Sequence, residues 1–356
     1  MKVIILYNKL FHYRIPVWNL IATHCDLTVA YSLGDGSIPS DMQCNFKIMH
    51  LPCKIYAKRF VIQNDDIRKI VKNYDVVVAY GDISWLKYST LPWFSNNKVV
   101  FHTLGVSASY SKGYDQQKKW DKIRYLFYKK AAALAFYTSY PIQKYKKLGI
   151  QESNMFVAPN TVSVEPVNYP VIKDSILMIG TLYKEKGIQL LLDAYLQLKD
   201  LQNLPNLFII GNGPDYNIIK EWINFNNMSD LIHLEGPIYN ISDKAKYFAR
   251  AIACISPKQA GLTVLESMGY GVPFITSANA ITGGEMLNIH NGIDGIILEN
   301  ESDLIKIIED IALEPNKYIE MGLKAKEFYD KNRTIKHMAD GLWNAIQFAY
   351  NSGKRK

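Results

Sequence analysis

Short, almost wholly apolar segments recur along the chain, and stretches long enough for a helix separate them. In the first half these segments are residues 3–7, 27–31, 75–80, 98–103, 134–138 and 156–159. A strand that is apolar on both faces is typical of a parallel sheet covered by helices on both sides. Because strands and helices alternate throughout, the sequence predicts a parallel α/β architecture.

The alternation occurs twice, which indicates two domains. The chain has 356 residues, more than one hydrophobic core normally organises. Residues 163–174 hold two prolines and no periodicity, as in a linker. A second series of apolar segments follows at 176–179, 207–210, 232–234 and 252–255. We predict domains at 1–163 and 175–333, followed by an amphipathic helix within 334–356.

Several classes of protein are disfavoured by what the sequence lacks. No run of eighteen apolar residues could span a membrane, and the apolar start is too short for a signal peptide. We therefore expect a cytoplasmic protein, either free or peripheral on the inner membrane. The cysteines form no C-x-x-C pair, so we expect neither a zinc site nor a disulfide framework.

Positive charge is concentrated in the first half. Residues 1–160 contain 22 lysines and arginines against 10 acidic residues, which suggests an anionic partner. A long basic helix is predicted near 116–133. The aromatic residues interleaved with the cations are Tyr110, Tyr114, Trp120, Tyr125 and Tyr128, and the cations are Lys112, Lys118, Lys119, Lys122, Arg124, Lys129 and Lys130. This stretch is either a membrane-surface patch or a solvated helix over a core stripe. No nucleic-acid-binding motif is present, so nucleic acid is not expected.

Residues 251–276 carry the strongest chemical signal. They read as strand, glycine-containing loop, helix and strand. A loop feeding a helix N-terminus presents backbone N–H groups to phosphate, and Glu266, one turn into the helix, could accept bonds from sugar hydroxyls. An ordinary βαβ turn with a surface glutamate is the alternative.

Within this stretch the pattern G-L-x-x-x-E-x-x-x-x-G-x-P-x-I, from Gly261 to Ile275, resembles the donor-site signature of family 4 retaining glycosyltransferases. The resemblance implies the GT-B fold: two Rossmann-like parallel-sheet domains facing a cleft, with a C-terminal helix crossing back to the N-terminal domain. It also implies that Glu266 binds the nucleotide ribose, and that the N–H groups of Gly261, Leu262 and Thr263 bind the diphosphate.

A second segment, from Gly180 to Gly187, resembles the family's strand-loop-Lys-Gly motif. The resemblance assigns Gly180 to the donor site and makes Lys186 the diphosphate-binding lysine. Such a cation would stabilise the growing charge of the leaving group. Thr181 stands where the family often has arginine, and Lys184 is a candidate replacement. Alternatively, these lysines only solvate a helix start.

Two glycine-containing turns also match the donor side of the family. Gly211 and Gly213 correspond to a donor-side turn, and Pro237 with Ile238 corresponds to a loop that lines the nucleobase. Both are otherwise explained as tight turns after strands.

In the first half, His102 lies in a Phe-His-Thr context that matches a family histidine at the reaction centre. The predicted catalytic residues are therefore His102, Lys186 and Glu266. Polar residues after other strands of this half are expected to recognise the acceptor; they are His12, Tyr13, Arg14 and Asp82. The family's glycine-rich first loop is absent here.

One departure concerns Lys258. The commoner family form has a second glutamate eight residues before Glu266, but this chain has Lys258 there. The sugar-binding role of that glutamate does not transfer. We hypothesise instead that Lys258 binds the donor diphosphate and replaces the cation lost at Thr181.

The resemblance thus predicts transfer of a sugar from a nucleotide-sugar to a glycan or lipid-linked acceptor. Retention of configuration, no metal or other cofactor, and a role in bacterial surface polysaccharide synthesis are expected. Two alternatives stay open: a GT-B nucleotide-sugar epimerase, which needs acid/base carboxylates, and a non-catalytic sugar-nucleotide binding protein.

Overall fold

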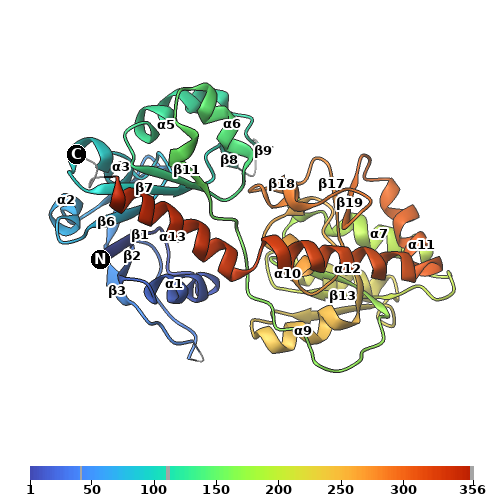
Figure 1. Cartoon of the computed structure of the whole chain (residues 1–356). Coiled ribbons are helices and arrows are strands. Elements are labelled where there is room, and N and C mark those ends of the chain that lie inside the picture. The colour runs from blue at the N-terminus through green and yellow to red at the C-terminus, as the bar shows by residue number, and fades with distance from the viewer. Residues whose placement is uncertain (41, 110–112, 353–356) are drawn as a thin grey trace. The chain divides into compact units, whose positions relative to one another are not determined.

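The computed structural model describes residues 1–40, 42–109 and 113–352, and the chain divides into two compact units (Figure 1). Among the described residues, the first unit contains 1–108, 113–161 and 335–352, and the second contains 162–334 together with Ser109. The chain therefore leaves the first unit after Thr161 and returns to it at Ile335.

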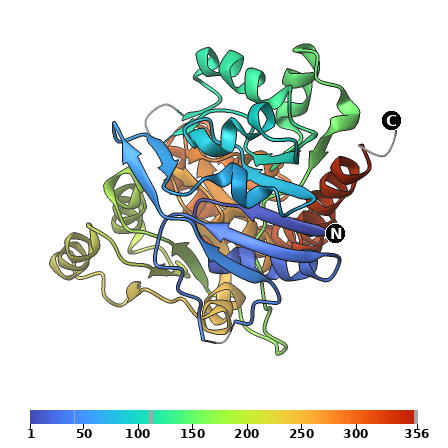
Figure 2. The ribbon, with the colours of Figure 1, turned by 90° about the vertical axis from the view of Figure 1, so that its left-hand side faces the viewer.

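The first unit is built on a seven-stranded parallel sheet in the order β11-β10-β7-β6-β1-β2-β3 (Figure 2). Its central strands are buried on both faces, as their apolar sequences predict. The strands are β1 (Lys2–Leu6), β2 (Asp26–Tyr31), β3 (Lys47–His50), β6 (Val76–Tyr80), β7 (Lys98–Thr103), β10 (Ala133–Phe136) and β11 (Met155–Val157).

Short helices and two small strand pairs surround this sheet. The helices are η1 (His12–Arg14), α1 (Ile15–Ala22), α2 (Ile67–Val71), α3 (Leu86–Ser89), α4 (Leu91–Phe94), η2 (Lys118–Trp120), α5 (Asp121–Tyr128), α6 (Tyr140–Lys147) and η3 (Glu152–Asn154). The strand pairs are β4 (Cys53–Tyr56) with β5 (Phe60–Gln63), and β8 (Ala108–Ser109) with β9 (Gly113–Tyr114).

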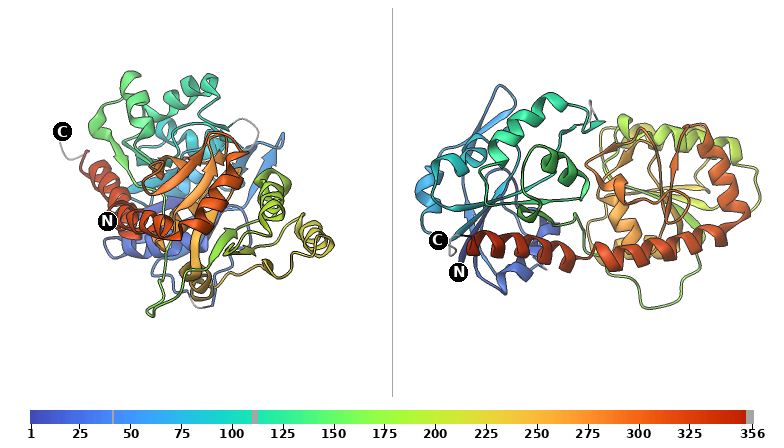
Figure 3. Two further views of the ribbon diagram at one scale, coloured as in Figure 1. Left: turned by 90° about the vertical axis from the view of Figure 1, so that its right-hand side faces the viewer. Right: turned by 45° about the horizontal axis from the view of Figure 1, so that its top comes forward.

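The second unit has a six-stranded parallel sheet in the order β14-β13-β12-β15-β17-β19 (Figure 3). Its strands are β12 (Ser175–Ile179), β13 (Asn206–Ile210), β14 (Ile232–Gly236), β15 (Ala251–Ile255), β17 (Phe274–Ser277) and β19 (Gly295–Leu298), with the pair β16 (Gln259–Ala260) and β18 (Ile281–Thr282) beside them. The helices are η4 (Lys184–Lys186), α7 (Ile188–Leu198), α8 (Tyr216–Phe225), α9 (Ile241–Arg250), α10 (Thr263–Gly269), η5 (Glu285–Asn288), α11 (Asp303–Leu313) and α12 (Pro315–Asn332).

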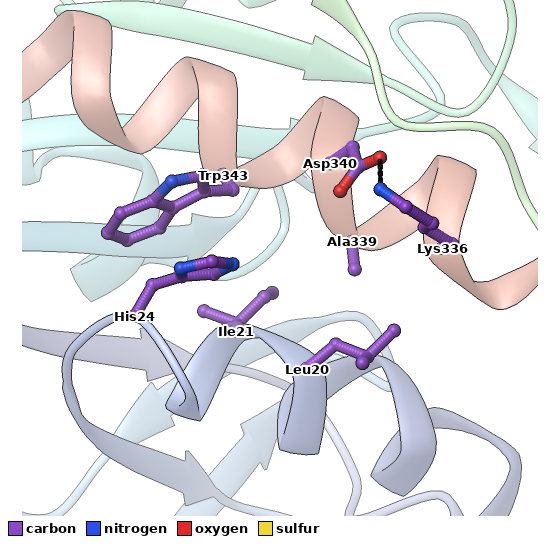
Figure 4. A pocket seen from close by; sticks show the side chains of 7 residues that line it. All are labelled: Leu20, Ile21, His24, Lys336, Ala339, Asp340 and Trp343. Carbon is purple, nitrogen blue, oxygen red and sulfur yellow. Dashed lines mark hydrogen bonds and ion pairs between the residues drawn. The ribbon is translucent and has the colours of Figure 1, made fainter.

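The last helix, α13 (Ile335–Asn351), belongs to the first unit, as predicted (red in Figure 1). It packs against α1 and against strands β7, β10 and β11. Its buried face consists of Met338, Ala339, Leu342, Ala345, Ile346 and Ala349, at the spacing that one side of a helix requires. A cavity of about 240 Å³ lies between α1 and α13, where His24 stacks on Trp343 and Lys336 pairs with Asp340 (Figure 4).

Two predicted helices are wrong in part. The helical spacing of Phe60, Ile67, Ile70 and Val71 predicts a helix over residues 58–73. The chain instead forms the β4–β5 hairpin and then only α2. Ala57 and Lys58 have positive φ in its turn, so the chain reverses just where the helix was expected to begin. The basic helix predicted at 116–133 is also shorter: α5 ends at Tyr128, because β10 begins at Ala133 and the chain must turn between them.

Candidate functional site

In the second unit, the predicted donor residues flank the point where the order of strands reverses. From β12 the sheet continues through β13 and β14 on one side, and through β15, β17 and β19 on the other. Open α/β sheets bind ligands outside the carboxyl ends of the strands at such a reversal. Lys186 follows β12, and Gly261 with α10 follows β15. The two motifs, distant in sequence, therefore meet at one edge.

The glycine turn after β13 packs directly on the loop after β12. The Gly180 N–H donates to the carbonyl of Ile210 at 2.9 Å. A Cβ atom on Gly211, whose φ is +151°, would lie 1.9 Å from the Gly180 oxygen, and one on Gly213 would lie 2.1 Å from the Leu182 oxygen. Both glycines are therefore required by the close approach of two backbones, a use that is independent of any ligand.

Lys186 is a buried cation at this edge. Only 3% of the residue is exposed, and its Nζ donates to the carbonyl of Ile179 at 2.6 Å. Burial lowers the pKa of its ammonium to about 8, and the nearby Cys254 on β15 opposes that shift. Gly180 leaves room for this ammonium, since a Cβ there would lie 2.2 Å from Nζ. A buried ammonium held by one neutral carbonyl gains from an added anion.

Glu266 lies on α10 and is paired. Its Oε1 accepts a short charged hydrogen bond from Nζ of Lys244 on α9, and both side chains are largely buried. The helix starts with bonds from Val264 N–H to Gly261 O and from Glu266 N–H to Leu262 O. The first N–H groups of a helix have no acceptor within it, so Leu262 and Thr263 can offer theirs to an anion.

Lys244 was not singled out from the sequence. The sequence predicts the helix, and Asn240 caps it by accepting from the N–H groups of Ser242 and Asp243. No local pattern says that one of its lysines faces Glu266, because that contact depends on how α9 packs beside α10.

The loop after β15 contacts the loop after β12, yet the Lys258 ammonium has another partner. The Lys258 N–H donates to the Lys186 carbonyl at 3.2 Å, whereas its Nζ lies 3.0 Å from Oε2 of Glu301. Thr181 and Lys184 are exposed. Substitution of Lys258 for the missing cation therefore requires that a ligand phosphate displace Glu301, and the hypothesis stays a prediction. Pro237 is exposed and Ile238 half-buried after the edge strand β14.

Glu285 is a further candidate that sequence reasoning missed. It is 8% exposed, and its Oε2 accepts from the Gly283 N–H at 2.9 Å. The β16–β18 pairing aligns Ala260 with Thr282, which places the loop that carries Glu285 beside the loop of Gly261. An acidic residue after two glycines and a strand was the available signal.

The candidate residues of the first unit lie at its own reversal of strand order, between β1 and β6. The segment of His12, Tyr13 and Arg14 follows β1, Asp82 follows β6, and His102 lies near the end of β7. His12 is exposed, while Tyr13 is half-buried and stacks on Phe11.

His102 is held neutral in an aromatic setting. It is 2% exposed, and its ring lies 4.5 Å from that of Tyr137 and 6.3 Å from that of Tyr7. Burial, reinforced by the charge of Arg14, lowers its pKa to about 3, although a backbone bond with Ala158 opposes this. Nε2 has no hydrogen-bond partner within the described part of the chain. At neutral pH this side chain can hydrogen-bond but carries no charge.

Arg14 and Asp82, predicted to bind the acceptor, already have partners. Arg14 is buried, and its guanidinium donates to Oδ1 of Asn160 at 2.5 Å and faces the ring of Tyr137. Burial opposes its charge, yet the surrounding tyrosines raise its pKa above the usual value. The Asp82 carboxylate accepts from both the N–H and the hydroxyl of Ser84 at 2.8 Å, as in a turn.

The predicted basic and aromatic stretch separates into two environments. Arg124 is buried and donates to Asp121 and to Ser107, and Tyr128 is also buried. Exposed cations lie instead against aromatic rings: Arg59 lies 4.2 Å above the half-buried ring of Trp120, and Lys129 and Lys130 approach the exposed ring of Trp93. Tyr110 and Lys112 lie outside the described residues.

The described residues contain neither a metal-binding cluster nor a membrane-spanning helix. No group of three His, Cys, Asp or Glu side chains gathers there at metal-binding distance. None of the described helices combines the length and apolarity needed to cross a membrane.

Comparison with known proteins agrees with the location of this site. Residues 165–328, which include the whole edge around Lys186 and Glu266, match the family model "Glycosyl transferases group 1". Over 176 residues the chain is also 26% identical to an uncharacterized glycosyltransferase of Haemophilus influenzae, a match that spans 47% of this chain and 48% of that protein. The match thus covers about half of the length of this relative.

Solved structures resemble the fold of the whole chain. Anabaena Alr3699/HepE in complex with UDP has a TM-score of 0.69 at 13% identity, with 98% of this chain and 100% of that chain covered. The lipopolysaccharide outer core galactosyltransferase WaaB has a TM-score of 0.65 at 16% identity, with 98% and 99% covered. The predicted resemblance to glycosyltransferases is confirmed at the level of group 1, and the finer assignment to family 4 stays a prediction. The predicted GT-B fold of two parallel-sheet α/β units with a returning C-terminal helix is also confirmed.

Proposed function

We propose that the protein is a retaining glycosyltransferase that takes a sugar from a nucleotide-diphosphate-sugar and adds it to a hydroxyl of a glycan or lipid-linked acceptor. The observation that carries the proposal is the strand reversal between β12 and β15. A buried lysine follows one strand there, and a helix start with Glu266 follows the other. Nucleotide diphosphates need these features: a cation and N–H groups for the phosphates, and a carboxylate for the ribose.

In this proposal, Lys186 and the N-terminal N–H groups of α10 hold the diphosphate. The bond from the anomeric carbon to the phosphate oxygen breaks, and the new bond to the acceptor oxygen forms on the same face of the sugar. The acceptor proton leaves with the diphosphate. Charge that grows on the leaving group is stabilised by a cation already in place. We propose that these groups of the chain act without a metal.

An acceptor site in the first unit is proposed around the edge that carries His102 and Arg14. A neutral histidine and a ring of tyrosines suit hydroxyl-rich sugars, because aromatic faces pack on sugar rings while Nε2 remains available for one hydrogen bond. A role in surface polysaccharide synthesis is supported by the description of WaaB as a lipopolysaccharide outer core galactosyltransferase.

We also propose that the first unit rests on anionic membrane surfaces. Trp93, Phe94 and Leu126 are 45%, 61% and 46% exposed, and Lys129 and Lys130 lie beside the ring of Trp93. Exposed aromatics next to lysines are typical of residues at the headgroup level. At such a surface the protein would encounter lipid-linked acceptors.

The transferase proposal is tested with UDP-glucose and analogues that differ in base and sugar. Calorimetry should show binding by the wild type, and incubation with glycolipid acceptors should give a product whose anomeric configuration, read by NMR, equals that of the donor. EDTA should not reduce the rate. Conversion of the donor sugar without acceptor would instead indicate an epimerase, and binding without any turnover would indicate a sugar-nucleotide binding protein.

Membrane binding is tested with vesicles. The triple variant Lys119→Gln/Lys129→Gln/Lys130→Gln should release the protein from phosphatidylglycerol vesicles, and so should high salt, because both weaken the attraction between charges. Wild-type binding that is equal on neutral and anionic vesicles would contradict this part of the proposal.

A further inference from the structure

A cavity of about 650 Å³ opens in the first unit, and none of the residues assigned above to the donor or acceptor lines it. Helix α2 and the residues just before it form one wall, and helices α3 and α4 form the other. Its volume is in the range of small-molecule sites, roughly 300–1,000 Å³. Nothing in the proposed transferase reaction uses it.

Four cations line this cavity: Arg68, Lys69, Lys72 and Lys87. None of them forms an ion pair within the part of the chain that the structure describes. Lys87 donates to the backbone carbonyl of Asp65 at 2.7 Å, and Arg68 faces the ring of Phe94 at 5.2 Å. Like charges that converge repel one another, so the cluster is stabilised when an anion enters.

Asp66, the acidic residue in the lining, offsets this charge only in part. Its Oδ1 accepts from the Arg68 N–H at 3.2 Å and caps α2. The carboxylate therefore serves the backbone at the start of α2, and three positive charges of the cavity are left without compensation.

The cavity also has an apolar part. Ile67 and Leu91 belong to its lining although each is only 1% exposed, and Phe94, which is 61% exposed, offers the larger apolar surface. A ligand with a phosphate next to an apolar portion would satisfy both the cations and this apolar part. Arginine and lysine are the side chains that proteins use to bind phosphate.

We infer that the cavity between α2 and α3–α4 binds a phosphate ester, separately from the donor and acceptor sites. Its phosphate contacts Arg68, Lys69, Lys72 and Lys87, and its apolar portion packs on Ile67, Leu91 and Phe94. A phospholipid headgroup and a free phosphorylated metabolite share this chemistry. The inference goes beyond the proposed transfer reaction and does not depend on it.

The test compares two triple variants that lose the same charge. Arg68→Gln/Lys69→Gln/Lys72→Gln removes cations from the cavity, and Lys47→Gln/Lys146→Gln/Lys147→Gln removes exposed cations elsewhere in the same unit. The probes are inorganic phosphate and dihexanoyl phosphatidic acid below its critical micelle concentration, each measured by calorimetry. The cavity variant should bind at least about tenfold more weakly, a change of 1.4 kcal/mol, whereas the other variant should bind as the wild type does.

The probes also separate the two sources. Binding of both probes, lost only in the cavity variant, supports a general phosphate site; binding of phosphatidic acid alone supports a lipid headgroup. Lys87→Gln, on the opposite wall, should weaken binding in the same direction, and thermal unfolding checks that each variant folds. No binding by the wild type, or binding by the cavity variant within twofold of it, overturns the inference. UDP affinity, measured in parallel, reports on the donor site alone.

Discussion

At the scale of single residues, the proposed donor site contains an ammonium that is costly to keep charged. The pKa of Lys186 is about 8 in the folded protein, and the pKa of a lysine in an unfolded chain is about 10.4. Between these values the unfolded chain binds more protons, so this lysine makes the free energy of unfolding rise with pH. The charge available to a diphosphate falls over the same range.

Donor affinity and stability should therefore respond to pH in opposite directions. Calorimetry with UDP should show affinity falling from pH 7 to pH 9.5 in the wild type, while Lys186→Met should bind weakly at every pH. Chemical denaturation over the same range measures the free energy of unfolding. The contribution of Lys186 to it should rise with pH in the wild type and be absent from Lys186→Met. Lys199→Gln, an exposed lysine on α7's C-terminal side, is the control. Parallel pH profiles for wild type and Lys186→Met would contradict the assignment.

Glu266 and Lys244 should behave as one unit. Glu266→Ala should weaken UDP binding by about 1–3 kcal/mol, the size of a lost charged hydrogen bond. Lys244→Met should weaken UDP binding less than Glu266→Ala does, because it removes only the partner that orients the carboxylate. Since the two residues are in contact, the loss of binding free energy in the double variant should be smaller than the sum of the two single losses. Additive losses by calorimetry would show that the pair does not act on the nucleotide together.

The sequence was informative about which residues enter this site and silent about their partners. Lys186 and Glu266 are candidates because their local motifs resemble those of glycosyltransferase donor sites, and both motifs follow strands that end at a common edge. The partners Lys244 and Glu301, and the burial of Arg14, depend on contacts between elements far apart in the chain. No spacing in the sequence encodes those contacts.

At the scale of secondary-structure elements, α13 approaches β11 at a glycine. A Cβ atom on Gly341 would lie 2.1 Å from the carbonyl oxygen of Val157. Gly341→Ala should therefore push the helix from the sheet and lower the free energy of unfolding by about 1–3 kcal/mol, as overpacking does. Gln347→Ala, at an exposed position of the same helix, should have little effect. If the wild type and Gly341→Ala have the same free energy of unfolding in denaturant, α13 can shift away from β11 without a loss of stability.

Elements were predicted well where burial sets the pattern. The central strands of both sheets are apolar on both faces, and α13 shows a clear helical stripe. The prediction for residues 58–73 was wrong because Phe60, Ile67, Ile70 and Val71 fit a helical spacing. Phe60 is instead the exposed first residue of strand β5. Left-handed backbone at Ala57 and Lys58, unusual for residues with a side chain, gave no signal in the sequence.

At the scale of the whole molecule, the first unit is completed by the end of the chain. Removing residues 335–356 would expose the faces of α1, β7, β10 and β11 that α13 covers. We expect hydrogen exchange to show loss of protection in β1, β7 and β10 of the truncated protein, with β12, β13 and β15 still protected. Uniform loss of protection in both units would show that they unfold together.

The return of α13 also fixes the order in which the molecule can mature on the ribosome. Domains usually fold as they emerge, with the N-terminal one first. Here residues 162–334 are synthesised and released while the first unit still lacks a helix of its core. The unit that begins first is therefore finished last, and its exposed apolar surface is the part of the nascent chain that a chaperone would need to shield.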